Sequence, residues 1–89
     1  MRFQLGQTVA TPGALQALQE ANQSPMEFLS RHVNGNWGEV GREDADANER
    51  AADDEARILS VYRTCQGVKL WVITEADRSA TTILLPEEY

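Results

Sequence analysis

The 89-residue sequence contains a single cysteine, a single histidine and no long apolar run. Because Cys65 has no second cysteine to pair with, the chain cannot form an internal disulfide or a zinc site built from several cysteines. The longest apolar stretches, residues 70–74 and 81–85, fall far short of the roughly 20 residues that a membrane-spanning helix needs. The first thirteen residues include no apolar stretch as long as that of a signal peptide. We therefore expect a cytoplasmic protein that does not bind a membrane.

The formal net charge of −6 is unevenly distributed along the chain. Residues 42–56 hold seven of the fourteen acidic residues and two of the eight basic residues, which gives this segment a net charge of −5. The other 74 residues sum to −1, so the acidity belongs to one segment. Such a segment is either a solvated helix face or a recognition surface for a basic partner, and the second possibility includes mimicry of nucleic-acid phosphates.

The N-terminal half of the sequence carries two clear helix starts. Thr11-Pro12 and Ser24-Pro25 each combine a capping hydroxyl with proline at the first helical position. They predict helices over residues 12–21 and 25–33. The acidic, alanine-rich residues 44–56 also favour a helix, but they offer little apolar area, so we expect this helix to be loosely held at the surface.

After the acidic segment the apolar period changes from 3.6 residues to 2, which is typical of strands. Residues 57–63, 68–74 and 80–85 predict three strands joined by short turns, and residues 3–10 predict a short first strand. A meander this small needs helices on one of its faces. We therefore expect one α+β domain over residues 1–89, in which two or three N-terminal helices pack on one face of a three- to four-stranded antiparallel sheet, the C-terminal meander.

His32 is the only side chain with an unperturbed pKa near neutrality, so any acid–base mechanism has to begin with it. At 100° per residue it falls within the apolar arc of the second helix, between Phe28 and Leu29. It is then either partly buried and hydrogen-bonded to a backbone carbonyl, or directed across the sheet towards polar strand residues. We expect no metal and no cofactor, because there is no second histidine and the carboxylates lack ligand spacing.

Polar strand residues complete the candidate catalytic site around His32. They are Arg57, Ser60, Arg78, Ser79 and Thr82. A guanidinium beside two hydroxyls suits a phosphate or a carboxylate. The alternative is structural, with a solvated hairpin tip at residues 75–79 and threonines placed by ordinary β propensity.

A family resemblance rests on Asn48 and on four segments, VATPGALQAL (9–18), LSRHVNGNWGEV (29–40), ILSVYR (58–63) and KLWVITEADRSATTILLPEEY (69–89). Through them nearly the whole chain resembles a group of short uncharacterised bacterial proteins that are plasmid-related or found near restriction genes. Together with the acidic segment and the lack of a catalytic motif, this resemblance implies a non-enzymatic interaction module of mobile genetic elements. Its protein partner would belong to a restriction or toxin system and bind the acidic segment or a sheet edge. An edge strand is also compatible with a dimer.

A second and weaker resemblance is to small metal-independent ribonucleases of the barnase, EndoU and RelE-like kind. In those enzymes a helix histidine faces arginine, serine and threonine side chains on an antiparallel sheet. Here His32 matches the helix position, and the strand residues named above match the others by type. The alternative function is therefore ribonuclease chemistry, with a base that activates a ribose hydroxyl and cations that stabilise the phosphorane. Only under this alternative would nucleic acid be a partner.

Overall fold

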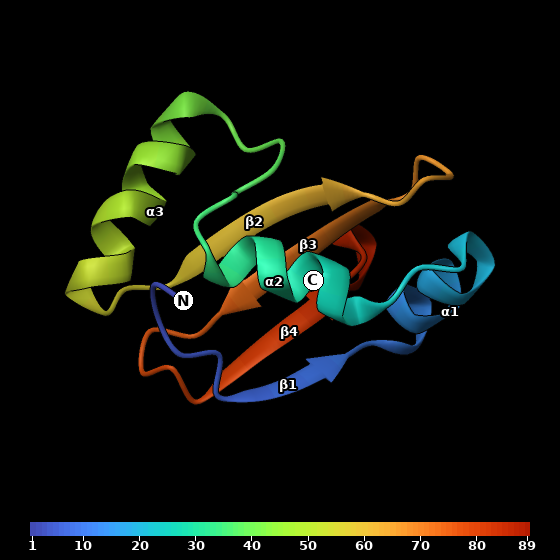
Figure 1. The fold of residues 1–89 in the computed structure, drawn as a ribbon, viewed down its shortest axis with the longest axis horizontal. Helices are drawn as coiled ribbons and strands as arrows, with labels where there is room; N and C mark the ends of the chain where they lie inside the picture. The colour runs from blue at the N-terminus through green and yellow to red at the C-terminus, as the bar shows by residue number, and fades with distance from the viewer.

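A computed structural model describes all 89 residues and contains one four-stranded sheet and three α-helices. Figure 1 shows the elements, which are β1 (Gln7–Ala10), α1 (Pro12–Ala21), α2 (Pro25–Val33), α3 (Arg42–Asp54), β2 (Ile58–Arg63), β3 (Lys69–Thr74), β4 (Ala80–Leu84) and a short 3-10 helix η1 (Pro86–Glu88). The two predicted N-terminal helices are confirmed. The Thr11 hydroxyl accepts a hydrogen bond from the Ala14 amide, and the Ser24 hydroxyl accepts one from the Met26 amide. No helix is long and apolar enough to cross a membrane.

The strands lie in the order β1-β4-β3-β2. The C-terminal meander is antiparallel as predicted, with Ser60 opposite Val72 and Val72 opposite Ile83. The prediction of a purely antiparallel sheet is wrong, because β1 pairs with β4 in parallel, with Thr8 opposite Thr81. Parallel pairing needs a long connection between the strands, and here it contains all three helices and two strands. No hairpin turn sets the direction of β1, so its local pattern did not reveal its orientation.

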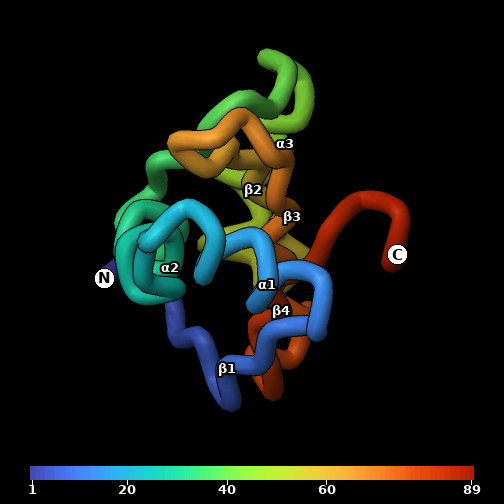
Figure 2. The backbone as a smooth tube through the Cα atoms, turned by 90° about the vertical axis from the view of Figure 1, so that its right-hand side faces the viewer, coloured from blue at the N-terminus to red at the C-terminus, as the bar shows by residue number.

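The helices do not form one N-terminal layer, which corrects the predicted architecture. Figure 2 shows α1 and α2 on one face of the sheet and the C-terminal segment on the other, and Figures 1 and 2 both place α3 beside the β2 edge. The core between α1, α2 and the sheet includes Leu18, Phe28 and Val72, each almost fully buried. α3 buries only Ala51 among its apolar residues, so it cannot form an extensive hydrophobic contact with a sheet face.

Candidate functional site

His32 lies in the core, at the interface between α2 and the sheet. Its side chain has no exposed surface. Nδ1 lies 2.6 Å from the Ser60 hydroxyl on β2, and Nε2 lies 2.9 Å from the Thr74 hydroxyl on β3. The histidine does meet polar strand residues, as one interpretation of the sequence expected, but it meets them in the interior and not in an open cleft.

These contacts belong to a continuous chain of buried hydrogen bonds. The Thr74 and Thr81 hydroxyls are 2.7 Å apart, and the Thr81 hydroxyl donates to the Leu5 carbonyl at 2.8 Å. Since Thr81 gives its only proton to Leu5, the Thr74 hydroxyl must donate to Thr81 and accept from His32. The proton of the neutral imidazole is therefore on Nε2, and Nδ1 accepts from Ser60. The chain connects α2, β2, β3, β4 and the segment before β1.

The surroundings of His32 favour its neutral form. Burial and, as a smaller cause, the positive charge of Arg78 together lower its pKa from 6.5 to about 4. The rings of Phe3 and Trp37 lie edge-on to the imidazole, with centroids 5.2 and 6.1 Å away. No buried side-chain nitrogen or oxygen lacks a hydrogen-bond partner. The imidazole is enclosed and fully paired, and this arrangement gives a substrate no access to it.

Arg78 binds backbone carbonyls at the end of α3. Its Nη2 donates to the Ala51 carbonyl and its Nη1 to the Ala56 carbonyl, both at 2.7 Å. Positive charge at a helix C-terminus is favourable, because the last carbonyls lack partners within the helix. The sequence suggested that Arg78 could bind a phosphate or a carboxylate, but in the structure its guanidinium holds α3 to the β3–β4 turn.

The structure separates the remaining candidate residues. Of the predicted catalytic set, only Ser60 contacts His32. Thr82 lies on the sheet face opposite to that of Thr81, and Ser79 is exposed in the β3–β4 turn. Arg57 lies near the C-terminus, where its Nη1 donates to the Tyr89 hydroxyl at 2.6 Å.

A different set of residues forms an apolar surface groove. The groove has a volume of about 350 Å³ and lies on the sheet face opposite to α1 and α2, and we call it the α3 groove. Its lining residues are Asp44, Ala47, Asn48, Arg57, Leu59, Trp71, Ile73 and Tyr89. The sheet supplies the apolar floor, α3 supplies one wall, and the C-terminal residue with Arg57 supplies the other.

Asn48 fixes the α3 wall of this groove. Its side-chain amide donates to the Leu59 carbonyl at 2.7 Å, and its side-chain oxygen accepts from the Leu59 amide at 3.2 Å. A single buried side chain thus pairs with both backbone groups of an edge residue, as a neighbouring strand would. Sequence reasoning missed this role, although a large polar residue in the stripe between Ala45 and Ala52 was an available signal.

Aromatic contacts shape the opposite wall. The rings of Trp71 and Tyr89 meet at 63° with centroids 5.6 Å apart. The Arg57 guanidinium carbon lies 5.3 Å from the centre of the Tyr89 ring, and Arg57 also faces Glu75 at 3.7 Å. Tyr89 remains 67% exposed, so its ring can contact a bound molecule.

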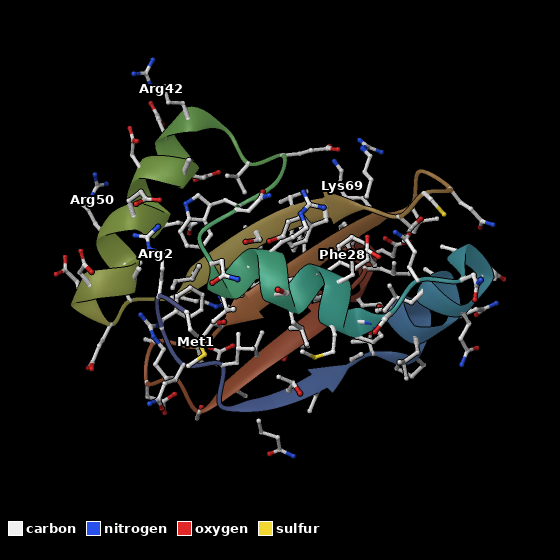
Figure 3. All side chains as sticks on the ribbon, in the orientation of Figure 1. Met1, Arg2, Phe28, Arg42, Arg50 and Lys69 are labelled. Carbon is white, nitrogen blue, oxygen red and sulfur yellow. The ribbon has the colours of Figure 1, made fainter.

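The charged residues that line the groove come from both of its walls. Asp44 lines it from α3 and Arg57 from the opposite wall, whereas Glu49 of the same helix accepts hydrogen bonds from Arg2 and Trp37. The basic residues Arg42 and Arg50 project away from the sheet, as Figure 3 shows. The groove therefore has an apolar floor, one carboxylate on its α3 wall and one guanidinium on the opposite wall, and its lining contains no histidine and no cysteine.

The chain offers no group of three or more histidine, cysteine, aspartate or glutamate side chains that could hold a metal ion. Comparison with family models, with curated proteins and with solved structures finds no match.

Proposed function

We propose that this protein is a small interaction module that binds a protein partner in the α3 groove. One observation carries the proposal. Leu59, Trp71 and Ile73 lie on the sheet face opposite to α1 and α2, and they form the floor of an open groove. Large apolar side chains at the base of a surface groove are typical of binding sites, where one well-packed anchor supplies much of the affinity.

The groove favours a partner segment with two chemical features. Its apolar floor suits a large aliphatic or aromatic side chain, and the Trp71 ring offers a flat contact surface. Asp44 and the net charge of −5 over residues 42–56 suit lysine or arginine residues beside that anchor. Charges of opposite sign accelerate encounter and orient the partner, and their contribution decreases as salt increases.

The positions of His32 and Arg78 do not favour the ribonuclease alternative. Acid–base catalysis needs a group within hydrogen-bond reach of the substrate, whereas His32 is enclosed by protein atoms and neutral at pH 7. Arg78, the cation expected to stabilise a phosphorane, donates to carbonyls of its own chain. We therefore assign both residues to the stability of the fold.

The resemblance to plasmid-related and restriction-locus proteins suggests what kind of partner to look for. We propose that the partner is a component of a restriction or toxin system of a bacterial mobile element. The acidic helix would then face a basic segment of that component, such as a surface that otherwise contacts nucleic acid.

A displayed peptide library tests the binding chemistry directly. The intact chain should select peptides that combine lysine or arginine with a large apolar residue. Ala47→Trp, which fills the groove from an exposed position on α3, should weaken their binding at least about tenfold, or by about 1.4 kcal/mol. Gln19→Trp on the exposed surface of α1 is the matched control and should leave binding unchanged.

Three results would count against the proposal. The first is selection of peptides without a basic or apolar preference. The second is equal binding of the selected peptides by wild type and Ala47→Trp. The third is cleavage of single-stranded RNA by the purified wild-type chain that is lost in His32→Gln, because this result would support the ribonuclease alternative.

A further inference from the structure

The strand β1 leaves one edge of the sheet open. The Gln7 amide donates to the Ser79 carbonyl at 3.0 Å, so this residue faces β4. Because the hydrogen-bonding direction alternates along a strand, Val9 also faces β4, whereas the amide and carbonyl groups of Thr8 and Ala10 point away from the sheet. No side chain forms a hydrogen bond with these outward-pointing amide and carbonyl groups. An open edge of this kind is a template for another strand.

The opposite edge of the sheet is covered by the chain itself. Asn48 pairs with both backbone groups of Leu59 on β2. Next to it, the Val61 amide donates to the Trp37 carbonyl at 3.1 Å, and the Glu39 amide donates to the Val61 carbonyl at 2.7 Å. The fold therefore protects one edge and leaves the other unprotected.

The open edge also lacks the side chains that usually prevent strand association. Charged residues, bulges and proline on an edge strand keep other strands away. No charged residue occurs from Phe3 to Gln19, and β1 contains neither a proline nor a bulge. Glu88 reaches the end of β1, but its carboxylate is engaged by the Thr11 hydroxyl and the Gly13 amide.

Apolar surface borders the open edge on its helical side. A shallow groove of about 250 Å³ lies there, lined by Thr8, Val9, Ala10, Leu15, Pro25, Leu29 and Ile83. Leu15 is 42% exposed there, and Met26, next to Pro25 in the chain, is 63% exposed. Val9 is 43% exposed, and because it pairs with Thr82 its side chain lies on the opposite sheet face. These three are among the five large hydrophobic residues that the whole molecule exposes. In strand addition, backbone bonds provide affinity and such grooves receive alternate side chains.

We propose that a second copy of this chain occupies this edge, with the two β1 strands antiparallel about a two-fold axis. Thr8 of each copy would exchange both backbone hydrogen bonds with Ala10 of the other. The two Val9 side chains would then meet at the axis as a non-hydrogen-bonded pair. The arrangement is self-complementary, as a two-fold interface must be, and it joins two four-stranded sheets into one.

The charge distribution favours a second copy in this position. Each chain carries a net charge of −6, but a charge of −5 resides in residues 42–56, which include α3. α3 lies beside β2, at the edge opposite to β1 (Figure 1). Pairing through β1 therefore places the two acidic helices at the far ends of the joined sheet, where their repulsion is screened by salt. The α3 groove stays open in both copies, so this inference does not depend on the proposed function.

The oligomeric state of the intact chain tests the inference. Sedimentation or light scattering over a concentration series should give a mass that rises from 9.9 kDa towards twice that value. Val9→Lys should raise the dissociation constant at least about tenfold, because it places two like charges at the axis. Gln19→Lys makes the same change of charge on exposed α1 and should leave the constant unchanged. Circular dichroism and thermal unfolding establish that both variants fold.

Amide exchange in the wild-type chain provides a second readout that needs no variant. Exchange at Thr8 and Ala10 should slow as the protein concentration rises, whereas the Gln7 amide, already bonded to Ser79, should exchange at a constant rate. A chain that stays monomeric over the whole series overturns the inference. A dimer that forms equally well with Val9→Lys, or without protection of Thr8 and Ala10, overturns it as well.

Discussion

The Nε2 atom of His32 on α2 lies 2.9 Å from the Thr74 hydroxyl on β3, 42 residues further along the chain. This contact joins the helical layer to the sheet inside the core. Because both ring nitrogens are paired, the only histidine of the molecule is satisfied where it is. Its chemistry is therefore used to hold the fold together, and the surface available for a partner lies elsewhere.

Removal of the His32 side chain should destabilise the protein strongly. His32→Ala leaves a cavity and takes the hydrogen-bond partner from the Ser60 hydroxyl, so the free energy of unfolding should fall by about 3 kcal/mol. Urea unfolding measures this change. Ser30→Ala, an exposed position on the same helix, should change the free energy by less than about 0.5 kcal/mol. A loss below about 1 kcal/mol for His32→Ala would show that the buried chain of hydrogen bonds contributes little.

The stability of the protein should decrease in mild acid. The pKa of His32 is lowered from 6.5 to about 4 in the folded state, so the unfolded chain binds a proton more readily between these values. The contribution of the neutral histidine is fully present above pH 6.5 and is lost as pH falls towards 4, by about 3 kcal/mol in total.

Unfolding of wild type and His32→Gln at pH 7, 5.5 and 4 separates this effect from titration of the carboxylates. Glutamine does not titrate, so the difference in stability between the two proteins should shrink as pH falls. A difference that is independent of pH would mean that His32 has an ordinary pKa in the folded protein.

Asn48 should be required for the attachment of α3. In Asn48→Asp a carboxylate replaces the amide that donates to the Leu59 carbonyl, and two acceptors then face each other. The expected loss is about 2 kcal/mol, with faster amide exchange at Leu59. Asp46→Asn makes the reverse change at an exposed position and is the control. Unchanged exchange at Leu59 would contradict the proposed role.

Arg78 should stabilise the last turn of α3. Arg78→Ala removes both bonds to the Ala51 and Ala56 carbonyls and should cost about 2 kcal/mol. Position 78 has a positive φ of 61°, and alanine, like arginine, carries a Cβ atom. The substitution therefore leaves the backbone strain at this position unchanged. Loss of helicity measured by circular dichroism, with Arg50→Ala as an exposed control of equal charge, tests this role. An equal loss of helicity in the two variants would mean that Arg78 contributes only through its charge and not through its hydrogen bonds.

Local signals in the sequence were sufficient for the helices and the meander. Each proline-capped start predicted its helix, since the cap and the first turn depend on adjacent residues, and the two-residue period predicted β2, β3 and β4. The direction of β1 depends on a distant partner, β4, and no short-range pattern encodes it.

The site was harder to predict because its contacts are long-range. One of the two interpretations of His32 directed it at polar strand residues, and the helical pattern alone could neither decide between them nor show that aromatic rings would enclose it. Arg78 resembled an anion-binding residue by its neighbours in sequence, whereas its two shortest hydrogen bonds go to carbonyls from 22 and 27 residues earlier. The α3 groove combines residues from the acidic segment, three strand positions and the last residue, and this combination exists only in the folded chain.

The most direct test of the central claim is site-specific photocrosslinking in cells of the native host. A photoreactive residue at position 47, in the α3 groove, should form a covalent conjugate with one protein, and that protein should present a basic and apolar segment at the crosslinked position. The same residue at position 19 on α1 should form no such conjugate. Conjugates that are absent at position 47, or equally abundant at both positions, would contradict binding through the α3 groove.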